Sequence, residues 1–163
     1  MHLALCSFMK WSGSVIGLLA LFGGLNCGDD PAAPPGNRFQ PVFTTLYSNV
    51  REKTELVVTT PEGWTQIWAQ ISAGTPSTNR PAVDFRNDDV IIVALGEKRK
   101  AGFNVHIEQV EFSDTTRNIV VLLTIPAETC SSSEVITTPL DAAVVSKSSR
   151  PTRFIERVTT LSC

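Results

Sequence analysis

Few residues in this chain have the chemistry of a catalytic group, and His106 is the main candidate. It is the only histidine after residue 26, so a Ser-His-Asp or Cys-His site would have to use it. The chain has no Gly-x-Ser-x-Gly segment, and the Ser7-x-x-Lys10 pattern falls in a predicted export signal. We expect His106 to face solvent on the polar side of a strand, and we expect the protein not to be an enzyme.

Three carboxylates, Asp84, Asp88 and Asp89, lie close together in the sequence. Their oxygens could hold Ca²⁺, but the spacing and the closing glutamate of an EF-hand are absent. A zinc site fails because too few cysteine and histidine ligands are available. Acidic residues beside a hydrophobic strand commonly cap it and keep it soluble, so the sequence predicts no metal site and no cofactor.

A short charged run, Glu97, Lys98, Arg99 and Lys100, is the candidate partner-binding segment. A basic loop tip can dock on an acidic partner. The alternative is a solvated turn, because charge at a loop tip needs no further explanation. The formal net charge of the whole chain is -2, which gives no indication of nucleic-acid binding.

Residues 1–26 have the features of an export signal. Lys10 precedes an apolar, glycine-rich run from Trp11 to Leu25, which is short for a membrane span and typical of a signal core. Met9 would also be an ordinary start for such a signal, so the choice between Met1 and Met9 stays open. In either case we expect this segment to be cleaved, which would also remove Cys6.

The segment that ends at Cys27 resembles a bacterial lipobox, the signal that leads to acylation of the cysteine. Gly24 and Asn26 replace the leucine and the small residue that the pattern usually has. We predict that Cys27 carries the lipid, palmitate included, and that residues 27–41 form a flexible proline- and glycine-rich tether. The alternative is an ordinary secretory signal cut elsewhere, with Cys27 left as a thiol.

If Cys27 is acylated, Cys130 and Cys163 are the remaining cysteines of the mature chain. Two cysteines in an oxidising compartment can pair in only one way, and a loop of this size would add roughly 3 to 4 kcal/mol of stability. We therefore predict a structural disulfide between them. The alternative is a pair of reduced, buried thiols.

The most informative stretch of the chain is an unbroken apolar run from Val90 to Leu95, which ends at Gly96. This pattern is typical of a strand that is covered on both faces. Residues 103–107 then alternate between apolar and polar, as in a strand with one buried face and one solvent-exposed face. We expect the two strands to form a hairpin through residues 96–102.

The apolar phase changes along the second of these strands. Val110 and Phe112 occupy even positions, whereas the apolar residues before them occupy odd ones. One extra residue near Glu108 or Gln109 would keep a single face buried, so we predict a β-bulge there. The apolar run from Ile119 to Ile125 should lie antiparallel to this strand.

A helix is predicted to follow Thr60, with Pro61 and Glu62 in its first turn. Its apolar side chains recur at helical spacing and should form the packing face rather than a ligand cage; they are Trp64, Ile67, Trp68 and Ile71. Gly74 and Pro76 should end the run.

The remaining apolar segments are expected to be strands. Residues 43–50 and 56–59 read as a pair, and residues 142–146 as a further strand. Residues 154–161 fit helical spacing, but their threonine and valine content favours a strand. Because the strands and the single helix do not alternate, we predict an α+β fold: a mainly antiparallel, twisted β-sheet with one amphipathic helix packed on a face.

Several of these features together resemble the C-terminal domain family of the protease-complex protein PrcB. They are the paired tryptophans, the Pro-x-Val-Asp-Phe segment at residues 81–85, the apolar strand that ends at Gly96, and the Gly102-Phe103 pair at which the next strand begins. The resemblance covers residues 43–147. One departure is that Lys100-Ala101-Gly102-Phe103 stands where the family has Thr-Gly-Gly-Tyr.

The expected organisation is a signal peptide at residues 1–26, a tether at residues 27–41 and one α+β domain at residues 42–163. The lipobox-like segment predicts a lipid-anchored protein of the bacterial cell envelope, at the outer membrane or the cell surface. The resemblance implies a role within a protease complex, so we expect the protein to bind or stabilise an exported partner. That partner would be a protease. The alternative is an envelope domain that binds a small ligand or glycan.

Overall fold

The computed structural model describes residues 38–73, 79–131 and 133–162. The predicted signal peptide, Cys27, most of the tether and Cys163 lie outside the described residues. No helix in the described part of the chain is long and apolar enough to cross a membrane. In chain order the elements are β1 (Phe39–Thr45), β2 (Lys53–Val58), α1 (Pro61–Ile71), β3 (Asp88–Leu95), β4 (Asn104–Phe112), β5 (Arg117–Pro126), β6 (Leu140–Ser146) and β7 (Thr152–Leu161).

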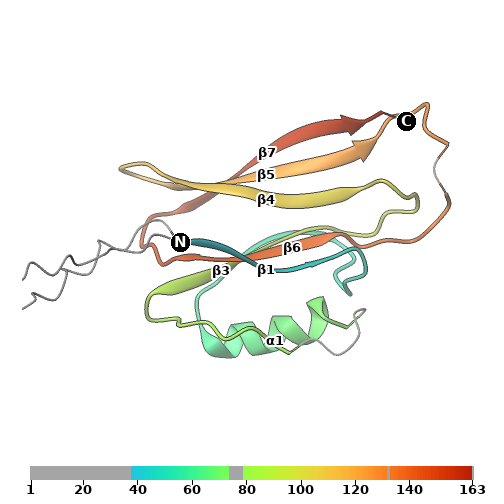
Figure 1. The fold of residues 1–163 in the computed structure, drawn as a ribbon. Helices are drawn as coiled ribbons and strands as arrows, with labels where there is room; N and C mark the ends of the chain where they lie inside the picture. Colours follow the sequence, from blue (N-terminus) through green and yellow to red (C-terminus); the bar gives the residue numbers. More distant parts are fainter. Residues whose placement is uncertain (1–37, 74–78, 132, 163) are drawn as a thin grey trace, which may run out of the picture. The chain divides into compact units, whose positions relative to one another are not determined.

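The strands form two sheets that lie face to face, and the helix covers the outer face of one of them (Figure 1). The four-stranded sheet has the order β1-β6-β3-β2, with every neighbouring pair antiparallel. The three-stranded sheet has the order β4-β5-β7, in which β5 and β7 run parallel. The predicted α+β class, mainly antiparallel with a helix on one face, is confirmed, and the structure adds the division into two sheets.

Two predicted strand pairings are wrong. The strand at residues 90–95 and the strand that begins after Gly102 do not form a hairpin, because β3 and β4 belong to different sheets. Both edges of β3 are taken by β2 and β6, so residues 96–103 instead carry the chain from one layer to the other. The strands predicted at residues 43–50 and 56–59 do not pair either, since β1 and β2 form the two opposite edges of the four-stranded sheet.

The predicted bulge in β4 is confirmed. Ile107 lies opposite Val121 and Gln109 lies opposite Val120, which leaves Glu108 as the extra residue. The insertion keeps the apolar side chains of β4 on the buried face after the phase change, as the pattern required. The strand predicted at the end of the chain is confirmed as β7.

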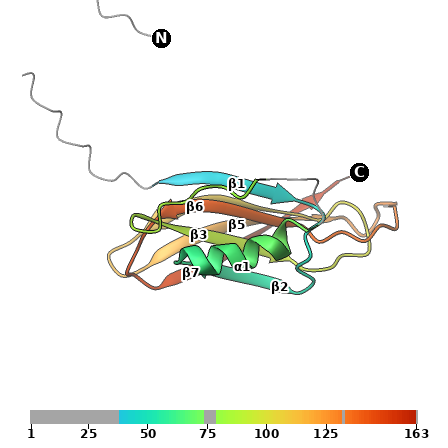
Figure 2. The same ribbon diagram turned by 90° about the horizontal axis from the view of Figure 1, so that it is seen from below.

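The first hydrophobic layer lies between α1 and the four-stranded sheet (Figure 2). Thr60 caps the helix, since its Oγ1 accepts the amide of Gly63 at 3.1 Å. The rings of Trp64 and Trp68 lie 5.1 Å apart at their centroids, and the indole N–H of Trp64 donates to the carbonyl of Pro81 at 3.0 Å. The paired tryptophans therefore form a packing face, as predicted.

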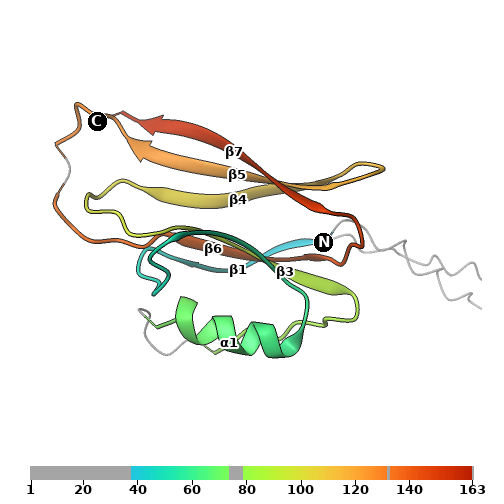
Figure 3. The same cartoon turned by 180° about the vertical axis from the view of Figure 1, so that it is seen from behind.

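The second hydrophobic layer lies between the two sheets (Figure 3). Successive residues of β3 contribute to opposite layers, because side chains alternate along a strand. Ile91 and Val93 point toward the three-stranded sheet, whereas Val90 and Ile92 point toward the helix. All four are essentially inaccessible to solvent, which confirms that β3 is covered on both faces.

A buried ion pair joins the two sheets. Arg117 of β5 donates to the carboxylate of Asp89 of β3 at 2.7 Å, and their side chains are 2% and 1% exposed. The guanidinium also donates to the carbonyl of Ser146 at 3.1 Å and to the hydroxyl of Thr152 at 2.8 Å. The second oxygen of Asp89 has no hydrogen-bond partner among the described residues, so the carboxylate depends on Arg117 for its compensation.

Removing this arginine should be costly. We expect Arg117→Met to lower the free energy of unfolding by about 3 to 5 kcal/mol, because it leaves a charged carboxylate buried without a partner. Urea denaturation followed by tryptophan fluorescence measures the change. The matched control is Arg157→Met, which breaks an exposed pair with Glu108 and should cost less than about 1 kcal/mol. Equal losses in the two variants would contradict this assignment.

Candidate functional site

The structure separates the three clustered carboxylates. Asp89 points between the sheets toward Arg117, Asp88 is bound by Arg38 at 2.7 Å, and Asp84 lies in the preceding turn. The described residues contain no group of three or more histidine, cysteine or acidic side chains that could hold a metal ion. The three carboxylates therefore do not converge on one ligand.

His106 lies on β4 with half of its side chain exposed, as expected, but it also has a buried partner. Its Nδ1 is 3.0 Å from the carboxylate of Asp141, which is 1% exposed. The same carboxylate accepts the amide of Ile107 at 2.7 Å and the hydroxyl of Thr44 at 2.6 Å. Sequence reasoning missed this contact, and the signal for it was an acidic residue inside the otherwise apolar strand β6.

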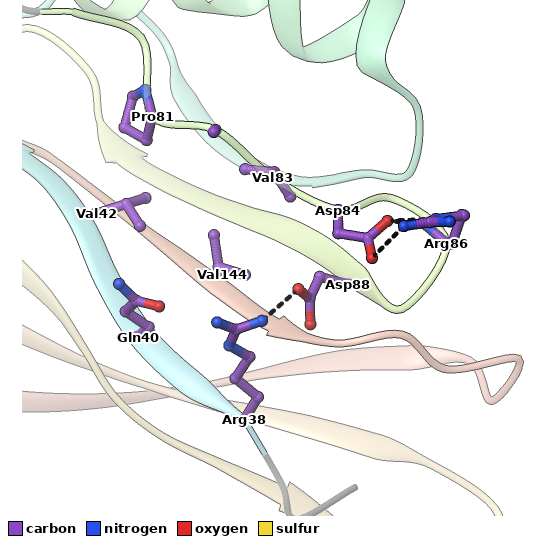
Figure 4. Close-up of a pocket in the computed structure, with 10 residues that line it drawn as sticks. Arg38, Gln40, Val42, Pro81, Val83, Asp84, Arg86, Asp88 and Val144 are labelled. Atoms are coloured by element: carbon purple, nitrogen blue, oxygen red, sulfur yellow. Dashed lines mark hydrogen bonds and ion pairs between the residues drawn. The ribbon is translucent and has the colours of Figure 1, made fainter.

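A groove of about 720 Å³ lies between β1 and the segment before β3 (Figure 4). Its floor is the part of the four-stranded sheet beside β1, and its wall is the segment that begins at Pro81. Two ion pairs lie along it, Arg38 with Asp88 at 2.7 Å and Arg86 with Asp84 at 2.9 Å. Apolar and polar groups alternate around the groove; the other lining residues are Gln40, Val42, Ala82, Val83 and Val144.

Asp84 is held strongly in its ionised form. The side chain and the backbone amide of Arg86 donate to its carboxylate, and Asn87 adds a further hydrogen bond at 3.0 Å. These hydrogen bonds lower the pKa of Asp84 to about 2. Because each carboxylate in the groove has an arginine partner, the groove offers hydrogen-bonding groups without a large net charge.

The second candidate site lies where three loops meet. Lys98 and Thr137 exchange two backbone hydrogen bonds of 2.8 Å, and the amide of Glu97 donates to the carbonyl of Arg51 at 2.8 Å. The amide of Ser48 donates to the carbonyl of Thr138 at 3.3 Å. These bonds fasten residues 46–51, 96–103 and 133–138 to one another.

Glycine is needed at one point of this junction. Gly96 has a φ of +71°, a conformation that other residues rarely adopt. A Cβ at this position would also lie 2.6 Å from the carbonyl oxygen of Arg51. The close approach of residues 46–51 to residues 96–103 therefore depends on the absence of a side chain at Gly96.

Large apolar side chains are exposed on this junction. Tyr47 is 52% exposed and Ile136 is 59% exposed. Ile136 lines two hollows, one of about 240 Å³ that Tyr47 also lines and one of about 350 Å³ that Arg99 and Lys100 also line. We call this region the Tyr47–Ile136 surface; its residues are Tyr47, Arg51, Glu97, Lys98, Arg99, Lys100, Glu134, Val135 and Ile136.

The structure places the predicted basic segment at this surface but gives its members different environments. Glu97 is mostly covered and lies 3.5 Å from both Arg51 and Arg99. The ammonium group of Lys98 lies 5.8 Å from the centre of the Phe103 ring. Arg99 is largely exposed and Lys100 is exposed as well. Sequence reasoning missed the apolar members, because they come from other parts of the chain.

The comparisons with known proteins give one match. Residues 90–146, which run from β3 to β6, match the family described as PrcB C-terminal. The match confirms the resemblance to this family over that segment, which contributes the basic loop and Ile136 to the Tyr47–Ile136 surface. Neither a curated protein nor a solved structure matched the chain.

The carboxyl group of Asp84 should titrate at about pH 2, well below the ordinary value of 3.8. We expect Arg86→Ala to move its pKa back toward 3.8, because the variant loses the largest contribution to the shift, the hydrogen bonds from the arginine side chain. The side-chain carboxyl carbon signal, followed by NMR from pH 6 to pH 1.5, reports both values. A pKa that stays near 2 in Arg86→Ala would assign the shift to Asn87 and the backbone amide instead.

Proposed function

We propose that the mature chain is a lipid-anchored protein of the bacterial envelope that acts as a non-catalytic interaction module. Its Tyr47–Ile136 surface would bind an exported protein. The resemblance to a domain of a protease-complex protein indicates a protease as that partner.

The observation that carries this proposal is the composition of the Tyr47–Ile136 surface. Exposed Tyr47 and Ile136 lie among Arg51, Arg99 and Lys100, and tyrosine and arginine are enriched at the energetic centres of protein interfaces. The backbone hydrogen bonds between the three loops fix the backbone that carries these side chains before any partner arrives. A preformed surface loses less conformational entropy on binding, which favours affinity.

The proposed anchor and disulfide fit the two ends of the described domain. β1 begins at Phe39, so a spacer of at most about 42 Å, at ~3.5 Å per residue, would join it to a lipid on Cys27. At the other end, the sulfur of Cys130 lies 3.4 Å from the carbonyl oxygen of Leu161, two residues before Cys163 in the sequence. This supports a Cys130–Cys163 bond that would tie the end of β7 to the loop after β5.

Substitutions on the Tyr47–Ile136 surface should release the partner. We expect wild-type protein, isolated from detergent-solubilised membranes, to carry one exported protein in stoichiometric amount. Tyr47→Ala with Ile136→Ala should reduce the recovered partner by roughly tenfold or more, since residues at the centre of an interface typically contribute this much. Mass spectrometry of the purified complexes measures the ratio.

The matched control is Leu56→Ala, which truncates an exposed side chain of β2 away from this surface and should leave the partner in place. A wild-type protein that purifies alone, or a loss of partner that is equal in Leu56→Ala, would contradict the proposal.

The groove favours a second candidate function, the binding of a small ligand or glycan. Its volume of about 720 Å³ suits such a ligand, and Arg38, Gln40 and Arg86 supply hydrogen-bonding groups. In this case the purified wild-type chain would carry no protein partner and would retain a small molecule, which Arg38→Ala with Gln40→Ala would release.

The anchor makes a separate prediction. Cys27→Ser should lose acylation and appear as a soluble or an uncleaved species, because the serine cannot carry the lipid by which the wild-type protein partitions into the detergent phase of a Triton X-114 extraction. Intact mass and phase partitioning of the two proteins measure this. Wild-type protein found in the aqueous phase and cut at another site would remove the lipid anchor while leaving export intact.

A further inference from the structure

The strand β7 forms a free edge of the three-stranded sheet, and it is the edge best suited to accept another strand. It is ten residues long, and its pairing with β5 runs without a register shift. A strand edge presents a row of backbone N–H and C=O groups that an extended chain can pair with. Proteins usually block such edges with prolines, bulges, charges or short strands.

The other three edges each have one of these features. β1 contains Pro41 and a register shift, and β2 is only six residues long. β4 carries the bulge at Glu108, and the amide of Ile107 already donates to Asp141. The contrast shows that β7 lacks the proline, the register shift and the short length that protect the other edges, and that charged side chains are the protection it carries.

The second half of β7 is largely exposed on its outer edge, although Glu156 forms an ion pair with Lys53 of β2. Its residues from Glu156 onward are exposed, including Val158 at 61% and Leu161 at 50%. The parallel partner of Val158 is Leu123, which belongs to the layer between the sheets. Val158 therefore points toward the interior of the sandwich at a place that the four-stranded sheet does not cover, and an added strand would reduce its exposure.

The charges of β7 indicate what kind of strand would fit. Arg153 and Arg157 are four residues apart and so lie on the same face, with Ile155 between them. Arg157 lies 3.3 Å from the half-exposed Glu108, and Arg153 has no ion-pair partner in the described part of the chain. Opposite charges directly across from each other stabilise a strand pair.

A second copy of the chain fits this edge poorly. When two β7 strands pair antiparallel, residues of the same face lie opposite each other. The two registers with the longest overlap place Arg157 against Arg157 or Glu156 against Glu156. Of the two shorter registers that follow, one places Arg153 against Arg157 and the other places no like charges opposite each other. Like charges directly opposite destabilise the pair, so the edge is better matched by a different, acidic strand.

We propose that the free edge of β7 accepts an extended segment of a partner protein as an added strand, with acidic residues four apart opposite Arg153 and Arg157. This proposal concerns a surface distinct from the Tyr47–Ile136 surface and does not rest on it. The added strand would extend the three-stranded sheet by one and would bring an apolar side chain against Ile155.

The probe is a fluorescein-labelled peptide, Thr-Glu-Thr-Val-Thr-Glu-Thr, titrated with the full chain in detergent and followed by fluorescence anisotropy. We expect saturable binding that weakens as salt is added, and at least about tenfold weaker binding of the peptide with lysine in place of both glutamates. The double variant Arg153→Glu with Arg157→Glu should reverse this preference. The control is Arg80→Glu with Lys147→Glu, which makes the same charge change at exposed positions outside β7 and should keep the preference for the glutamate peptide.

A second measurement on the wild-type chain tests strand addition directly. Only alternate N–H groups of an added strand point toward its neighbour. We therefore compare two glutamate peptides, one N-methylated at the second, fourth and sixth residues and the other at the third and fifth, and we expect them to differ in binding. One of these peptides should bind and the other should not. The proposal is wrong if both bind alike, if the glutamate and lysine peptides bind alike, if neither binds, or if the chain sediments as a dimer that the glutamate peptide dissociates.

Discussion

The centre of the four-stranded sheet is buried on both of its faces, and the rest of the structure depends on this constraint. β3 and β6 at its centre alternate small and branched apolar side chains between the helix layer and the inter-sheet layer. A sheet of this kind needs a cover on each side. The helix α1 provides one cover and the three-stranded sheet provides the other, which is why the chain must change layers between β3 and β4.

Polar side chains are used sparingly inside this arrangement, at points where they fix the two sheets relative to each other. Arg117 reaches Asp89 from one sheet to the other, and Asp141 receives the amide of Ile107 across the same interface. Hydrophobic packing alone is tolerant of small shifts, whereas these hydrogen bonds have defined distances and directions. They therefore favour one register of sheet on sheet at the cost of burying charge.

A rigid three-layer core of this kind leaves loops and edges as the places where binding can occur. Loops that run over a fixed scaffold commonly carry function, and here three of them are joined by backbone hydrogen bonds that hold Tyr47 and Ile136 in the solvent. The groove beside β1 exists because α1 does not extend over that side of the sheet. These surfaces suit recognition of another molecule.

The sequence by itself determined the features that arise from neighbouring residues: the Thr60 cap and the Trp64 face of the helix, the two-sided burial of β3, and the bulge at Glu108. These follow from local periodicity and capping, which are set within a few residues. The antiparallel pairing of β4 with β5 was also predicted, and the structure confirms it. The tertiary structure alone decided the partners of β1, β2 and β3, where Asp141 meets His106, and how Tyr47 comes to lie near Ile136. Such contacts join residues separated by much of the domain, and the competition of several apolar strands for the same neighbours is resolved by packing the whole chain at once.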